Sequence, residues 1–70
     1  MHELLKTNDG VFMSFVEAML KAEGIESQRI AATNAYHLGA PILYVDEDDA
    51  VRAKAVLELA KAEREKSSDE

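Results

Sequence analysis

The chain has 70 residues, and its 14 acidic and 8 basic side chains give a net charge of −6 at pH 7. This length predicts one small domain, which buries only about 60 % of the surface that its unfolded chain exposes. The absence of cysteine excludes disulfides, thiolate metal ligands and thiol nucleophiles. Self-association is therefore the first means of stabilisation to consider.

The acidic balance argues against two classes of partner. Nucleic-acid binding requires clustered lysines and arginines that neutralise phosphates, and an anionic membrane surface attracts the same groups. No apolar run approaches the roughly 20 residues that span a bilayer, and "MHELLKTND" lacks an apolar signal segment. We therefore expect a cytoplasmic protein that binds neither nucleic acid nor membrane.

A strand over residues 2–7 and a helix over residues 9–23 are predicted at the start of the chain. The segment "HELLKT" is apolar at its centre, and Asn8 or Asp9 then offers a side-chain oxygen that caps the helix. Gly24 is expected to end the helix, because glycine readily adopts the left-handed conformation found at helix C-termini.

One face of this helix carries apolar side chains that are expected in the core. They follow the spacing of a helical stripe and are Phe12, Phe15, Val16, Met19 and Leu20. Met13 falls outside the stripe, so its side chain is expected to be exposed. A stripe of this kind is more typical of core packing than of a ligand pocket.

Two further strands and a second helix follow. "ESQRIAAT" predicts the second strand, and the β-branched and aromatic residues of "PILYV" predict the third more strongly. Pro41 suits the first position of a strand, where its missing N–H costs least. Asp46 is a suitable N-cap for the second helix, and the acidic residues after it complement the positive end of the helix dipole.

The second helix is expected to contribute the rest of the core through Ala50, Ala53, Val56, Leu57 and Ala60. Arg52 is expected to pair with Asp48, one turn earlier. The apolar residues cease after Ala62. We therefore expect a single domain over residues 1–65 and a frayed or disordered tail over residues 66–70.

The order β-α-β-β-α predicts an α+β fold of the ferredoxin-like, split β-α-β type. The simplest connections place the third strand between the first two. The result is a three-stranded antiparallel sheet with both helices on one face. Such a sheet lacks the fourth strand that would cover the outer edge of the first strand, so backbone donors and acceptors stay open to a partner.

The strands also carry apolar side chains on both faces. If Leu5, Leu43 and Val45 point toward the helices, alternation makes the neighbouring side chains point away. Those neighbours are Leu4, Ile42 and Tyr44. These three residues form the predicted interface with another copy of the chain.

Three stretches of the chain resemble a family of small bacterial proteins described as putative prokaryotic signal-transducing proteins, a domain of unknown function. They are "ELLKTND", "MLKAEGI" and "ILYVDEDDAVRAKAVLELA", and together they span about residues 2–60. The resemblance implies a ferredoxin-like fold allied to the nitrogen-regulatory PII-like group, whose members work as oligomers. It implies no catalytic residues. The segment "AATNAYHLGAP" departs from the family pattern, so no shared ligand loop can be carried over.

A candidate ligand site lies in the loop between the second and third strands. Asn34, Tyr36 and His37 could contact a small molecule there, since loops often carry function. The alternative is a turn built from asparagine and glycine with two partly exposed rings, and the sequence favours this structural interpretation.

Two patterns could suggest a metal site, but neither fits one. Ca²⁺ needs about six to eight oxygens in a wrapped loop, which the acidic run 46–49 at a helix start cannot provide. Structural zinc needs several closely spaced ligands, and neither His2 nor His37 has such a companion. The helix N-terminus at residues 7–9 could attract an anion, but the carboxylate of Asp9 is expected to occupy the same donors.

No arrangement of residues points to catalysis. No serine or threonine accompanies a histidine in a recognised pattern, and three isolated glycines form no phosphate-binding loop. We therefore expect a non-enzymatic regulatory or protein-interaction module without cofactor or metal, acting as a homo-oligomer with a possible protein partner or small-molecule effector. The alternative is a domain that senses a metabolite near residues 34–40 or between subunits.

Overall fold

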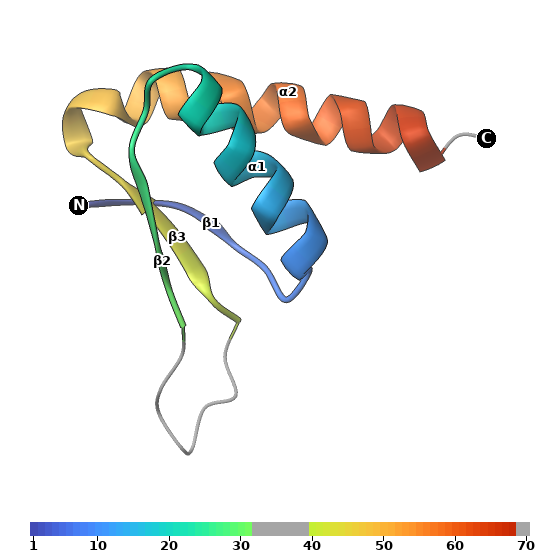
Figure 1. Ribbon diagram of the computed structural model, residues 1–70, viewed down its shortest axis with the longest axis horizontal. Helices are drawn as coiled ribbons and strands as arrows, with labels where there is room; N and C mark the ends of the chain where they lie inside the picture. Colours follow the sequence, from blue (N-terminus) through green and yellow to red (C-terminus); the bar gives the residue numbers. More distant parts are fainter. Residues whose placement is uncertain (32–39, 69–70) are drawn as a thin grey trace.

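The computed structural model describes residues 1–31 and 40–68 (Figure 1). Its elements are β1 (His2–Lys6), α1 (Gly10–Ala22), β2 (Ser27–Ile30), β3 (Ile42–Val45), the 3-10 turn η1 (Glu47–Asp49) and α2 (Ala50–Ser68). The strands form one antiparallel sheet in the order β1-β3-β2. The predicted α+β fold, its element order and the central position of the third strand are confirmed.

Asp9 caps the start of α1 through one side-chain oxygen and contacts α2 through the other. Asp9 Oδ1 accepts a hydrogen bond of 3.0 Å from the backbone N–H of Phe12, and Asp9 Oδ2 lies 3.0 Å from Arg64 Nη2 in α2. The backbone N–H of Asp9 donates to Thr7 Oγ1, also at 3.0 Å. The carboxylate thus satisfies a free donor of the helix N-terminus. Capping by Asp9 is confirmed, and its carboxylate stands where an anion would bind.

Gly24 ends α1 as the sequence predicts. Its φ angle is +76°, in the left-handed region, and the chain then turns back on the helix. The backbone N–H of Ile25 donates to the carbonyl of Leu20 at 2.9 Å, and that of Gly24 donates to Lys21 at 3.0 Å. These two bonds satisfy carbonyls that the end of a helix leaves free. They also direct the chain into β2.

Replacing Gly24 with alanine is expected to lower the free energy of unfolding by about 1 kcal/mol, because a Cβ atom disfavours the left-handed conformation. An added Cβ meets no atom within 4 Å at Gly24 or at Gly10, so packing does not distinguish the two sites. Gly10→Ala, at the first residue of α1, is therefore the matched control and should leave stability unchanged or slightly raised. Urea unfolding followed by circular dichroism measures both, and equal losses would contradict the explanation.

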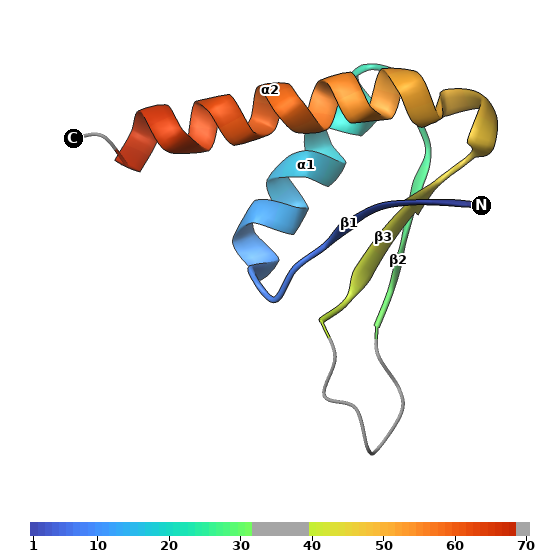
Figure 2. The ribbon, with the colours of Figure 1, turned by 180° about the vertical axis from the view of Figure 1, so that it is seen from behind.

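The core lies between the sheet and the two helices, which cover the same face of the sheet (Figures 1 and 2). Leu43 and Val45 of the central strand are buried there together with Ile25. The predicted face of α2 is confirmed, because Ala53, Val56, Leu57 and Ala60 are buried and Ala50 is half-buried. α2 continues to Ser68, so the predicted domain boundary at residue 65 falls inside this helix.

The predicted core face of α1 is only partly right. Phe12, Val16 and Leu20 are buried as expected. Met13, however, is fully buried, whereas Phe15 is 41 % exposed. The apolar side chains of α1 cover a wide arc, and helical spacing alone does not tell which part of that arc the sheet and α2 will cover. The packing selects the side that contains Met13, so the predicted exposure of Met13 was wrong.

The start of the second helix also differs from the prediction. Asp46 caps η1, since its Oδ1 accepts from the backbone N–H of Asp48 at 3.1 Å, and α2 begins only at Ala50. Arg52 Nη1 lies 3.3 Å from Asp49 Oδ1, so the ion pair predicted with Asp48 was wrong. A 3-10 turn has three residues per turn, which moves Asp48 out of the row that an uninterrupted α-helix would have aligned with Arg52.

Candidate functional site

The strand register defines which side chains face away from the helices. Directly opposed residues of an antiparallel pair share a face of the sheet. Leu43 and Val45 face the helices, so Ile42 and Tyr44 must face the other way. Their cross-strand neighbours complete this surface, which we call the open face: Glu3, Lys6, Gln28, Ile30, Ile42 and Tyr44.

A bulge in β1 changes the predicted membership of this surface. Glu3 pairs with Tyr44 and Leu5 pairs with Leu43, which leaves Leu4 as the extra residue of β1. Both Leu4 and Leu5 pack against the core. The predicted outward orientation of Leu4 was therefore wrong, while Ile42 and Tyr44 lie on the open face as predicted. Because the bulge adds one residue to β1, Lys6 pairs with Ile42 and lies on the same face of the sheet as Glu3.

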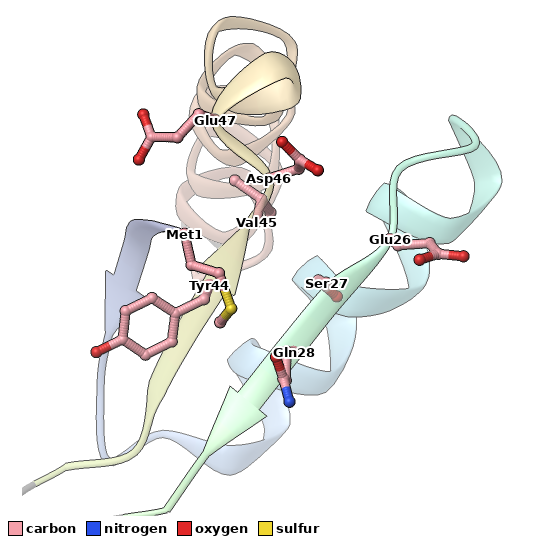
Figure 3. Close-up of a pocket in the computed structure, with 8 residues that line it drawn as sticks. All are labelled: Met1, Glu26, Ser27, Gln28, Tyr44, Val45, Asp46 and Glu47. Carbon is pink, nitrogen blue, oxygen red and sulfur yellow. The ribbon is translucent and has the colours of Figure 1, made fainter.

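The centre of the open face is apolar. Ile42 and Tyr44 stand on the central strand and are half-buried by their neighbours, and Ile30 on β2 is 44 % exposed. Figure 3 shows this side of the sheet near Tyr44, with the side chain of Met1 beside the tyrosine and Gln28 on the neighbouring strand. Sequence reasoning left Ile30 out of the interface, although its alternation with Arg29 was the signal that could have included it.

A shallow hollow of about 510 Å³ adjoins Tyr44 at the end of β3 (Figure 3). Its polar lining is mainly acidic and consists of Glu26, Ser27, Gln28, Asp46 and Glu47. His2 Nδ1 lies 3.9 Å from Glu47 Oε1 at its margin. This lining favours a neutral or cationic occupant and disfavours a phosphorylated one.

The residues around the hollow do not form a nucleophile–base pair. His2 and Ser27 each stand opposite Val45, from strands on either side of β3. Since adjacent strands are about 4.8 Å apart, the two residues are separated by roughly 10 Å across the sheet. Val45 of the central strand therefore lies between the histidine and the serine, which are not the direct neighbours that a nucleophile and its base must be.

Arg29, the basic residue of β2, faces the helices instead of the open face. Its Nε donates to Glu17 Oε2 at 3.2 Å, and its Nη2 donates to Ser14 Oγ at 3.1 Å and to Glu17 Oε1. These contacts fix β2 to α1. They also leave Glu3 and Lys6 as the two charged members of the open face, so their formal charges cancel.

Both outer strands have an open edge. Within residues 1–31 and 40–68, β1 and β2 each pair only with β3. No strand of the described chain covers the outer edge of β1, as the fold prediction anticipated. Unpaired strand edges can add a strand from another chain, although a bulge and charged side chains, both present in β1, resist such pairing. The open face is therefore a better candidate contact than the edge.

The predicted ligand residues Asn34, Tyr36 and His37 lie outside the described residues. Within the part of the chain that is described, there is no group of three or more histidine, aspartate or glutamate side chains that could hold a metal ion. Neither helix in the described ranges combines the length and the apolar character needed to cross a bilayer.

Comparison with known families gives one match that covers most of the chain. A family model described as "Putative prokaryotic signal transducing protein" matches residues 1–61. This range contains the whole sheet, α1 and every residue of the open face. No curated protein and no solved structure matches the chain.

Proposed function

Because the chain belongs to the family described as putative prokaryotic signal transducing proteins, we propose that it is a small regulatory module that works through self-association and has no enzymatic activity of its own. The observation that carries this proposal is the open face. It presents Ile30, Ile42 and Tyr44 to solvent on the side of the sheet opposite the helices. We propose that another copy of the chain covers this surface.

Charge supports a second copy as the occupant. Each chain carries a net charge of −6, so two copies repel each other over most of their surface. The open face is an exception, because it combines an apolar centre with one acidic and one basic residue, Glu3 and Lys6. Burial of this surface would remove apolar area from water, and each Å² removed stabilises the contact by roughly 25 cal/mol. It would not bring uncompensated charges together.

Tyr44→Glu is expected to lower the average mass in solution, because it places a charge at the centre of the surface buried by the second copy and so removes the contact through the open face. Light scattering at tens of micromolar measures the mass, and circular dichroism checks that helicity is retained. Asn8→Glu adds the same charge at an exposed position in the turn between β1 and α1 and should leave the mass unchanged. A wild-type protein that is monomeric at this concentration would overturn the proposal.

The hollow beside Tyr44 favours a second candidate function, the sensing of a small molecule. Such a molecule would sit among Met1, Gln28 and Tyr44 at the margin of the contact, between subunits. The acidic lining selects a neutral or cationic metabolite. A sensor gains thermal stability from a ligand that binds its folded state. The test is a panel of neutral and cationic metabolites, with the melting temperature of the protein measured in the presence of each. If none of them raises the melting temperature, this second function is contradicted, whereas the proposal of self-association is not affected.

A further inference from the structure

α2 has apolar residues on two opposite sides. One side is buried in the core, and the other side faces solvent. The solvent-facing residues recur at intervals of four, four and three positions and are Val51, Ala55, Leu59 and Ala62, which we call the outer stripe. Val51 is 85 % exposed and Leu59 is 57 % exposed. A helix that packs on a core through one side normally has polar residues on the opposite side.

A row of charged residues runs along one flank of the outer stripe. Its members are Lys54, Glu58, Lys61 and Glu65, all exposed, at spacings of four, three and four residues that keep them on one side of the helix. The other flank holds Arg52 and Glu63, which border hollows beside the end and the start of α1. The charged row therefore lies on the side of α2 away from α1.

The signs of this row alternate as plus, minus, plus, minus from the N-terminal to the C-terminal end. Read in the opposite direction, the same row is minus, plus, minus, plus. When two copies of the row lie antiparallel, each positive charge therefore faces a negative charge of the other copy. We propose that the outer stripe binds the outer stripe of a second copy, with the two α2 helices antiparallel about a twofold axis near Leu59.

The helix geometry fits this contact. A twofold axis perpendicular to both helices keeps the charged rows of the two copies on the same side of the contact. With the axis at Leu59, Lys54 of each copy meets Glu65 of the other, and Glu58 meets Lys61. At a rise of 1.5 Å per residue, the members of each pair differ by only about 1.5 Å along the axis. Leu59 meets its own counterpart, and Ala55 meets Ala62, small residues that allow the two helices to approach closely.

The charges also discriminate between registers. A different register would have the twofold axis two residues nearer the N-terminus, at the level of Leu57 along the helix. Lys54 would then lie beside Lys61 of the other copy, and Glu58 beside Glu58 of the other copy. Like charges in contact are destabilising, so the row disfavours this alternative. The contact requires no residue of the open face, and the C-terminal part of α2 extends beyond the strands (Figure 1). This inference shares self-association with the proposed function but places a contact on a separate surface.

The test exchanges the charges of one pair. Glu58→Lys and Lys61→Glu should each weaken dimerisation through α2 about tenfold, because each converts two attractive contacts into two repulsive ones. A mixture of the two single variants should form a heterodimer, since the introduced lysine of one chain then faces the introduced glutamate of the other. Sedimentation equilibrium of each variant and of the mixture measures these species, with Tyr44→Glu as the background that removes the contact through the open face.

The mixture separates contacts between chains from contacts within one chain. Glu58 Oε2 and Lys61 Nζ lie 3.6 Å apart in the same helix, and each single variant loses this pair whether alone or mixed. Recovery on mixing therefore reports a contact between chains. Variants that match the wild type, or a mixture that gains nothing, would overturn the inference. If Tyr44→Glu leaves the mass unchanged while mixing restores association, the contact through the open face fails and the contact through α2 stands.

Discussion

Leu43→Ala is expected to leave the chain largely unfolded at 25 °C. Leu43 lies on the central strand, and its side chain is fully buried between the sheet and the helices. Truncation of a buried leucine to alanine lowers the free energy of unfolding by about 2.7–5.0 kcal/mol. The loss has two parts: the removed methyl groups are no longer transferred from water to the core, and a cavity remains in their place. A domain of fewer than about 70–80 residues rarely has more than 3–5 kcal/mol of stability in total. The loss is therefore comparable to the whole free energy of unfolding.

Ile42→Ala provides the matched control for this result. Ile42 precedes Leu43 on the same strand, but it lies on the open face and is half-buried. Its truncation should cost about 1 kcal/mol or less in the isolated chain, since the site is not enclosed. Urea unfolding at several protein concentrations separates this loss from any contribution of self-association. Equal destabilisation by the two variants would mean that both sides of β3 are enclosed.

The two ends of α1 could be predicted because they depend on neighbours in the sequence. Asp9 caps α1 by reaching the N–H of Phe12, three residues away, and Gly24 ends the helix through its own φ angle. The alternation of "ILYV" likewise separates Leu43 and Val45 from Ile42 and Tyr44. Such features act within one turn or one strand, and the amino-acid sequence records them directly.

The features that escaped prediction depend on contacts between elements. The bulge at Leu4 arises from the register between β1 and β3, and no residue type in "HELLK" requires it. The bond between Arg29 and Glu17 joins residues twelve positions apart. On the sheet, alternation predicted correctly that Ile42 and Tyr44 face away from the helices, but alternation alone does not predict the bulge that turns Leu4 toward the core.

The outer stripe of α2 is a different case, because its signal was present in the sequence. Two apolar series run through this helix at helical spacing, one through Ala53, Val56 and Leu57, and the other through Val51, Ala55 and Leu59. Recognition of the first series as core leaves the second unexplained. The structure shows that the second series faces solvent, and its charged flank then suggests what could cover it.

Met13→Ala is expected to destabilise the chain more than Phe15→Ala, although phenylalanine is the larger side chain. Met13 is fully buried, and truncation of a buried methionine costs about 2–5 kcal/mol. Phe15 is 41 % exposed and should lose about 1 kcal/mol or less. Both residues lie in α1, so the change in helix propensity on substitution by alanine is small and similar. Thermal and urea unfolding followed by circular dichroism would rank the two variants.

The helical stripe predicted from sequence gives the reverse order. With Phe15 in the core, its truncation would cost about 3–5 kcal/mol, and an exposed Met13 would tolerate alanine. The two interpretations therefore differ in the sign of the stability difference as well as in its size. A lower midpoint for Phe15→Ala than for Met13→Ala would mean that α1 is rotated about its axis relative to the sheet and α2. That rotation would bring Phe15 into the core and turn Met13 toward solvent.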